Sequence, residues 1–199
     1  MNELPRTEDS RREPSSAPPA PATVCSFTLP PCLFLIGPRG SGKSTVARLL
    51  AHQLGWDWLD ADDELEKRYG RSIRAIFEAE GEAGFREKES VILAELCCLR
   101  RYVIATGGGV VLRESNRALL RASGRVVWLT ADVETLWQRV QTDSGTAERR
   151  PPLTVGGRME MEEILRLREP LYRHCADLIV DTSGRTPAEV AAEILRGLS

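Results

Sequence analysis

Short apolar runs alternate with longer stretches in which apolar residues recur every three or four positions, from residue 32 to the end of the chain. The short runs predict buried strands, and the longer spacing predicts amphipathic helices. The predicted strands are 32–36, 57–60, 102–106, 125–129 and 177–181. The predicted helices are 43–54, 62–69, 73–80, 82–100, 115–123, 132–141, 158–174 and 187–198. This alternation predicts an α/β fold of three layers, in which a five-stranded parallel sheet is covered by helices on both faces.

The last predicted helix carries its own start signal. Thr186 stands at the expected N-cap, Pro187 follows at the first helical position, and Glu189 stands three residues after the cap. Threonine and glutamate at this spacing predict a capping box, in which each side chain accepts a hydrogen bond from the other residue's backbone N–H. The pattern therefore predicts a helix that begins at Pro187.

Three regions depart from the alternation. Residues 1–31 hold seven of the twelve prolines, show no periodicity and predict a disordered tail, whose acidic residues argue against a transit peptide. Residues 61–100 place three short helices between two strands, more than one crossover needs, and predict an inserted substrate-binding subdomain. Residues 142–157 are rich in glycine, proline and arginine, and predict a lid loop. The folded domain is thus expected over residues 32–199.

Composition and charge exclude several classes of protein. The net charge of −2 gives no electrostatic reason to expect a nucleic acid or an anionic membrane as partner. No apolar run approaches the roughly 20 residues that cross a bilayer. The five cysteines form no CxxC pair and the two histidines lie far from them, so we expect thiols of a cytoplasmic protein and no zinc site. We expect a cytoplasmic monomer whose partners are small molecules.

A glycine-rich turn follows the first predicted strand. Residues 37–44, GPRGSGKS, fit the pattern G-x-x-x-x-G-K-[ST] and lead into a predicted helix. Glycines allow backbone N–H groups to converge on phosphate oxygens, the lysine reaches the β- and γ-phosphates, and the serine hydroxyl is a Mg²⁺ ligand. The motif predicts a nucleoside triphosphate site made by Gly40, Ser41, Gly42, Lys43, Ser44 and Thr45.

Three aspartates follow the second predicted strand. Asp60, Asp62 and Asp63 stand at its carboxyl end, where open parallel sheets place their ligands. One carboxylate is expected to orient Mg²⁺ and another to accept a hydroxyl proton. The alternative is helix capping by Asp62 or Asp63, because aspartate prefers that position.

Arginines and glycines elsewhere complete the candidate chemistry. Arg86 stands early in a helix, and Glu89 could pair with it at helical spacing. Gly107–Gly109 follow a buried strand, where consecutive glycines indicate a closely approaching ligand.

One arginine of the lid, Arg149 or Arg150, could stabilise transferring phosphates. Near residue 170, one of three arginines is expected to bind a carboxylate and the other two to lie on the surface: Arg166, Arg168 and Arg173.

Taken in order, these motifs resemble the shikimate kinase family, which has the nucleoside-monophosphate-kinase-like P-loop fold. The resemblance covers about residues 32–199 and rests on an ordered series: GPRGSGKST, D-x-D, "GRSI…IF…GE…FRE.E", GGG, "RRPPL" and "R.R.PLY". It implies transfer of the γ-phosphoryl group of ATP to the 3-hydroxyl of shikimate, with Mg²⁺ as cofactor. This reaction gives shikimate 3-phosphate and ADP in the biosynthesis of chorismate and aromatic amino acids.

The resemblance also implies roles on the acceptor side. Asp62 matches the aspartate that binds the shikimate hydroxyls and acts as base, although Asp63 is an additional acidic neighbour. Arg86 and Arg168 match the pair that binds the shikimate carboxylate, and Gly107, Gly108 and Gly109 match the loop against the ring.

On the nucleotide side, the resemblance implies that Asp60 and Ser44 hold Mg²⁺. Arg150 matches the lid arginine, although the neighbouring Arg149 could share its role. Arg139 and Arg185 lie where the family contacts adenine.

Two other functions fit part of the pattern. One is a gluconate or nucleoside-monophosphate kinase of the same fold, against which the triple glycine and the pairing of Arg86 with Arg168 argue. The other is a nucleotide-dependent switch, whose GTPase version lacks the N/T-K-x-D motif here.

Overall fold

The first strand, β1 (Cys32–Ile36), lies at the centre of a five-stranded parallel sheet with the order β2-β3-β1-β4-β5. The computed structural model describes residues 30–142 and 157–198. The other strands are β2 (Asp57–Asp60), β3 (Tyr102–Ala105), β4 (Arg125–Thr130) and β5 (Leu178–Asp181). The helices are α1 (Lys43–Leu54), α2 (Ala61–Tyr69), α3 (Ile73–Leu96), α4 (Glu114–Ser123), α5 (Val133–Thr142), α7 (Gly157–Cys175) and α8 (Pro187–Leu198), with a short 3₁₀ helix η1 (Val110–Leu112).

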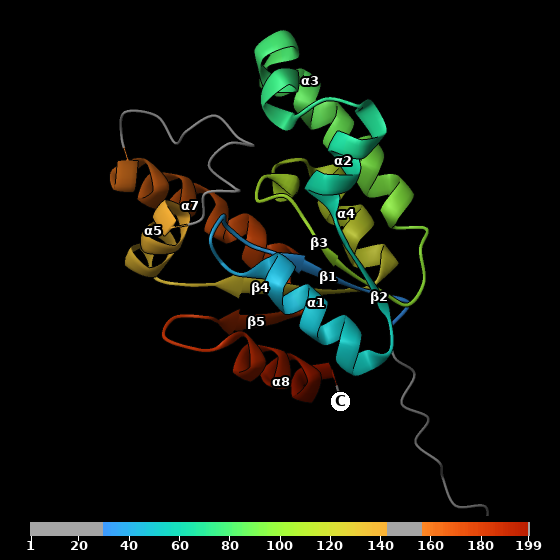
Figure 1. The fold of residues 1–199 in the computed structure, drawn as a ribbon, viewed down its shortest axis with the longest axis vertical. Coiled ribbons are helices and arrows are strands. Elements are labelled where there is room, and N and C mark those ends of the chain that lie inside the picture. The colour runs from blue at the N-terminus through green and yellow to red at the C-terminus, as the bar shows by residue number, and fades with distance from the viewer. Residues whose placement is uncertain (1–29, 143–156, 199) are drawn as a thin grey trace, which may run out of the picture.

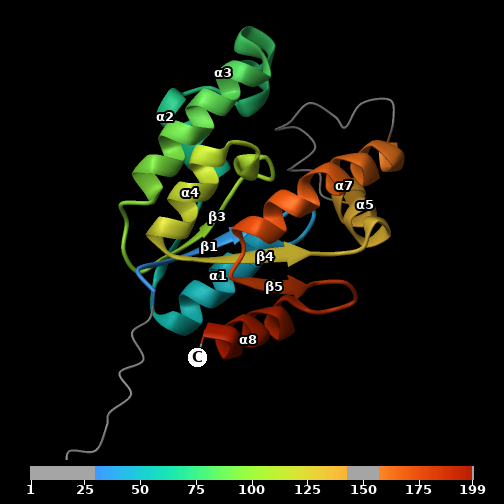
Figure 2. The same ribbon diagram turned by 180° about the vertical axis from the view of Figure 1, so that it is seen from behind.

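Helices cover both faces of this sheet, as predicted. Alternate residues of β1 point to opposite faces, because side chains on a strand alternate. Leu33 and Leu35 pack with α1 and α8, whereas Phe34 packs on the other face with residues of α4 and α7. Figures 1 and 2 show α1 and α8 on one side of the sheet and α4 and α7 on the other. The three-layer α/β prediction is confirmed.

The helix boundaries also follow the predictions closely. The predicted break between residues 80 and 82 is present, because Gly81 adopts φ 68° and ψ −174° and divides α3 into two parts. The second part ends at Leu96, four residues before the predicted end at 100. The 3₁₀ helix η1 was not predicted, and it follows directly after the three glycines.

The predicted start of α8 is confirmed in detail. The backbone N–H of Thr186 donates to Glu189 Oε2 at 2.8 Å, and the backbone N–H of Glu189 donates to Thr186 Oγ1 at 3.3 Å. These reciprocal bonds satisfy two N–H groups that the helix itself leaves without partners.

The parallel order brings the candidate motifs to one edge of the sheet. Asp60 is in register with Ala105, which is in register with Leu35. The residues that follow each strand at this edge are the aspartates, the glycines and the P-loop, in that order across the sheet. The helices α2 and α3 pack against each other and rise beyond this edge (Figure 1). Within residues 30–142 and 157–198, no helix is long and apolar enough to cross a membrane.

Candidate active site

The P-loop connects β1 to α1 through a backbone that only glycine adopts readily. Gly40 and Gly42 have φ of 82° and 87°, in the left-handed region, and Gly42 caps α1. A side chain at Gly42 would meet no neighbouring atom, so glycine is required there for its conformation alone. The loop therefore directs the N-terminus of a 12-residue helix, with its partial positive charge, at the edge where the other motifs lie.

The side chain of Lys43 lies back across this loop. Its ammonium donates to the carbonyl of Gly37 at 2.9 Å and to that of Pro38 at 2.8 Å. The hydroxyl of Ser41, which is fully buried, also donates to the Pro38 carbonyl at 2.8 Å. The lysine charge is thus held at the centre of the loop, where phosphate oxygens would lie.

The aspartates of β2 and α2 differ in environment. Asp60 Oδ2 accepts a hydrogen bond from Ser44 Oγ at 2.5 Å, and Asp60 Oδ1 accepts one from the backbone N–H of Asp62 at 3.0 Å. Asp60 is therefore the N-cap of α2, so the alternative that Asp62 or Asp63 caps this helix does not hold. Asp60 occupies the cap because the helix begins at Ala61, one residue earlier than predicted. Asp62 is half-buried, whereas Asp63 is exposed.

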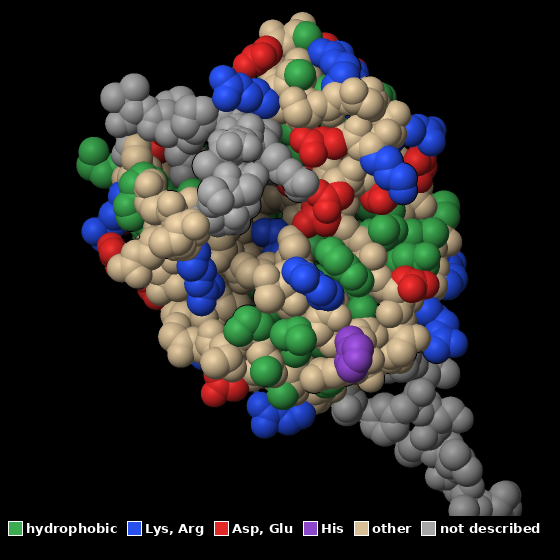
Figure 3. All heavy atoms as spheres, viewed as in Figure 1, with side chains coloured by type: hydrophobic (Ala, Val, Ile, Leu, Met, Phe, Trp, Pro, Cys, Tyr) green, Lys and Arg blue, Asp and Glu red, His purple; other side chains and the backbone are tan. Residues whose placement is uncertain are grey.

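Burial raises the pKa of Asp60 above its usual value of 3.8, and the carboxylate of Asp62 raises it further. The Ser44 hydroxyl acts in the opposite direction. A nearby cation would stabilise the charged form of this carboxyl group. Acidic side chains gather around the start of α2, beside a recess in this face of the molecule (Figure 3).

Arg86, on the second part of α3, is buried and ion-paired. Its Nη1 donates to Glu89 Oε2 at 2.8 Å, which confirms the predicted pairing at helical spacing. Its Nε and Nη2 donate to Glu82 Oε1 at 3.2 and 3.1 Å. A Cβ at Gly109 would overlap the Arg86 guanidinium, so the glycine is needed for the close approach of this side chain. The triple glycine was predicted to admit a ligand, and that prediction is not tested by this contact.

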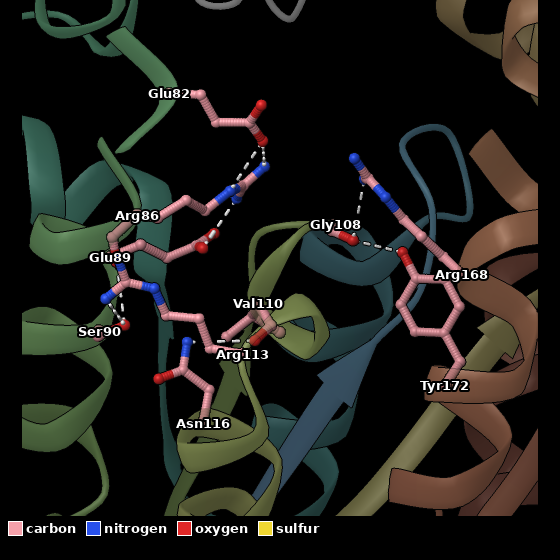
Figure 4. A network of polar contacts seen from close by, with 10 residues as sticks. All are labelled: Glu82, Arg86, Glu89, Ser90, Gly108, Val110, Arg113, Asn116, Arg168 and Tyr172. Carbon is pink, nitrogen blue, oxygen red and sulfur yellow. Dashed lines mark hydrogen bonds and ion pairs between the residues drawn. The ribbon is translucent and has the colours of Figure 1, made fainter. Parts of the chain in front are cut away.

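Arg168 reaches the same glycines from α7. Its Nη1 donates to the carbonyl of Gly108 at 3.3 Å, and the buried hydroxyl of Tyr172 donates to the same carbonyl. Figure 4 shows Arg86 and Arg168 on either side of Gly108, each side chain reaching toward the other. The structure therefore brings together two guanidinium groups and the glycines, which belong to three separate elements. Arg166 and Arg173 are mostly exposed, as expected for the other two arginines.

A cleft of about 330 Å³ adjoins the P-loop. It is lined by Ser41, Gly42, Thr45, Arg139, Thr182 and Arg185, among others. Arg139 Nη1 donates to Thr182 Oγ1 at 2.9 Å, and its Nη2 donates to the carbonyl of Thr182 at 2.8 Å. Arg185 Nη1 donates to the carbonyl of Asp181 at 2.9 Å. Both arginines that were expected near the nucleotide base thus border one cleft next to the phosphate loop.

Some residues of the site were missed by the sequence analysis, and others lie outside the described residues. Glu82 was not singled out, although its position four residues before Arg86 is a helical pairing signal. Thr182 was also missed, because no local pattern links it to Arg139. Arg149 and Arg150, with residues 143–156 of the expected lid and the tail to residue 29, lie outside the described residues.

Comparison with known proteins agrees with this geometry. The family model described as shikimate kinase matches residues 39–199. A shikimate kinase from Pseudomonas paraeruginosa is 48% identical over 166 residues, which cover 83% of this chain and 95% of the relative. A solved structure of shikimate kinase from Acinetobacter baumannii in complex with shikimate is 41% identical, with a TM-score of 0.80, over 85% of this chain and 93% of that chain. The shikimate kinase of Aquifex aeolicus is 35% identical, with a TM-score of 0.71, over 84% and 95%.

The matched residues include the P-loop from Arg39 onward, the aspartates, the glycine turn and both arginines that flank it. The fold, the order of the motifs and these relatives agree over more than four-fifths of the chain. On these grounds, the chain belongs to the shikimate kinase family.

Proposed function

We propose that this protein transfers the γ-phosphoryl group of ATP to the 3-hydroxyl of shikimate, giving shikimate 3-phosphate and ADP. Membership of the shikimate kinase family makes the chain an ATP-dependent kinase. The observation that supports the acceptor most directly is that Arg86 and Arg168 flank the carbonyl of Gly108 from opposite sides. Two guanidinium groups beside a turn without side chains suit a small carboxylic acid whose ring can lie against the turn.

The nucleotide would bind through the P-loop and the cleft beside it. Backbone N–H groups of Gly40, Ser41, Gly42 and Lys43 would contact the phosphates, with Ser44 and Thr45 at the start of α1. The Lys43 ammonium would exchange its carbonyl partners for phosphate oxygens. The base would lie in the cleft that Arg139 and Arg185 border.

Ser44 and Asp60 would hold Mg²⁺. A hydroxyl and a carboxylate 2.5 Å apart are the oxygen donors that Mg²⁺ accepts while it keeps several waters. The described residues contain no group of three or more His, Cys, Asp or Glu side chains that could bind a metal more fully. When bound there, Mg²⁺ would supply positive charge beside the phosphate oxygens of the nucleotide.

The acceptor would be oriented by its carboxylate. With the carboxylate between Arg86 and Arg168, and the ring against Gly107–Gly109, the 3-hydroxyl would face Asp62. The hydroxyl oxygen then bonds to the γ-phosphorus, the bond from that phosphorus to the β-phosphate oxygen breaks, and the hydroxyl proton passes to Asp62. Fixing both substrates in this way supplies on the order of 7 to 11 kcal/mol of the barrier reduction.

The helices α2 and α3, within the segment 61–100, would form the wall of the acceptor site, because Arg86 belongs to α3. Arg150 of the lid, or its neighbour Arg149, would stabilise the charge on the transferring phosphoryl group. Excluding water at that moment prevents hydrolysis of ATP. In the complete site, arginines would contact the acceptor on one side and the transferring phosphoryl group on the other.

A coupled ADP-release assay tests this function with shikimate, gluconate and nucleoside monophosphates as alternative acceptors. We expect shikimate to have the highest kcat/KM, and phosphorylated shikimate to accumulate in proportion to ADP. A higher kcat/KM for gluconate or a nucleotide would overturn the proposed acceptor. Tight ATP binding without any phosphorylated product would indicate a nucleotide-dependent switch instead.

A further inference from the structure

The guanidinium of Arg86 is shared between two carboxylates of its own helix. Glu89 accepts from Nη1 at 2.8 Å, whereas Glu82 accepts from both Nε and Nη2, at 3.2 and 3.1 Å. The pair Nε and Nη2 forms one edge of the guanidinium fork, the edge suited to a two-pronged contact with a carboxylate. Glu82 therefore holds the edge that an external carboxylate would use.

The two glutamates differ sharply in exposure. The side chain of Glu89 is 6% exposed, and that of Glu82 is 62% exposed, while that of Arg86 is 11% exposed. Glu89 is thus a fixed internal partner that keeps the buried guanidinium in place. Glu82 lies at the solvent end of the same guanidinium and can turn away into water at little cost, because exposed ion pairs contribute little.

The position of Glu82 places it over the acceptor site. It directly follows Gly81, where α3 is broken, and it lies at the start of the second part of the helix. Figure 4 shows the Glu82 carboxylate above the Arg86 guanidinium, on the side where Arg86 and Arg168 reach toward each other. A carboxylate between these two arginines would meet Glu82 as a charge of the same sign.

We propose that Glu82 is a specificity-determining residue that competes with the substrate's carboxylate for Arg86. This inference rests on the proposed function of the site. A ligand carboxylate displaces Glu82 by gaining Arg168 as a second cationic partner. A simple anion that contacts only Arg86 replaces one carboxylate contact with another and gains no binding free energy. Glu82 therefore disfavours small carboxylates that lack the acceptor's other contacts.

The test compares Glu82→Gln with Glu87→Gln in the full chain. Glutamine at position 82 keeps the size of the side chain but removes its charge. Glu87 is exposed on the same helix, so its replacement changes the net charge equally without touching Arg86. We expect E82Q to lower the KM and the calorimetric Kd for shikimate by about 1.5- to 5-fold, because the ion pair that Glu82 makes with Arg86 is partly exposed and contributes little. We expect E87Q to leave both values at those of the wild type.

A neutral analogue separates competition from other effects. Shikimate methyl ester has no charged carboxylate, so its inhibition constant should be the same for E82Q and the wild type. Acetate, in contrast, should inhibit E82Q more strongly than the wild type, because the Arg86 edge is then open to small anions.

Several outcomes would overturn the inference. A KM for shikimate that is unchanged or higher in E82Q would show that Glu82 does not compete, and a higher KM with a lower melting temperature would indicate a structural role. Equal tightening of shikimate and its methyl ester would also overturn it. These results differ from failure of the proposed function, in which the wild type itself neither binds nor phosphorylates shikimate and the inference fails with it.

Discussion

A single methyl group at Gly109 should displace Arg86 from the position in which we propose that it binds the substrate carboxylate. Gly109 has φ −101° and ψ 1°, a conformation that alanine can adopt, so the variant Gly109→Ala imposes no left-handed strain. Its Cβ would nevertheless overlap Nη1, Cζ and Nη2 of Arg86 together. The backbone at Gly109 is fixed by η1, which it caps, so the arginine side chain must move.

The size of the effect follows from what Arg86 loses. A hydrogen bond to a charged group contributes about 1.5–3 kcal/mol, so losing one to the substrate carboxylate should raise the KM for shikimate roughly 10- to 150-fold. The displaced guanidinium also leaves the buried Glu89 without its 2.8 Å ion-pair contact, which costs about 3–5 kcal/mol of folding stability. Alanine offsets about 0.4–1 kcal/mol of this cost by restricting the unfolded chain.

Steady-state kinetics and urea unfolding measure the two effects. The KM for ATP should stay near that of the wild type, because neither Gly109 nor Arg86 is among the residues that line the cleft proposed for the nucleotide base. The second variant is Arg86→Lys, alone and combined with Gly109→Ala. With no guanidinium to displace, the added methyl should raise the KM much less in the lysine background. A KM for shikimate within about twofold of the wild type in G109A, or equal effects of the methyl in both backgrounds, would refute the reasoning.

Three further predictions concern the P-loop and the aspartates. Lys43→Met should lower kcat by about 10²-fold or more while the circular dichroism spectrum stays native, since a preorganised charge on the phosphates is lost; near-normal turnover would refute its role. Asp62→Asn should lower kcat far more than Asp63→Asn, because Asp62 is half-buried and Asp63 is exposed; the reverse order would assign the base to Asp63. Asp60→Asn should raise the urea midpoint at pH 7, because a carboxyl whose pKa is raised on folding contributes stability below pH 3.8 that is lost as the pH rises. That gain should disappear below pH 3.8, and an equal gain at all pH values would contradict it.

Much of the candidate site could be predicted because its motifs are contiguous. The P-loop needs only its own glycines and the helix that follows, and the partners of the capping box of α8 are only three positions apart. The N-cap of α2 could not be assigned from the sequence, because Asp60, Asp62 and Asp63 all favour that position and their order does not say where the helix begins. In the structure Asp60 takes this position, and its carboxylate also accepts a hydrogen bond from Ser44, 16 residues earlier in the chain.

By itself, the sequence determined the order of strands and helices, the phosphate loop and the family, because periodicity and motifs depend on neighbours along the chain. The resemblance implied one site for Arg86, Arg168 and the glycines. Only the tertiary structure decided that Arg86 packs on Gly109, that Arg168 contacts Gly108, and that Glu82 contacts the arginine proposed to bind the substrate. The contact of Arg168 with Gly108 joins residues 60 positions apart. Such contacts arise from the parallel order of the strands and from packing across the sheet, and local patterns carry no record of either.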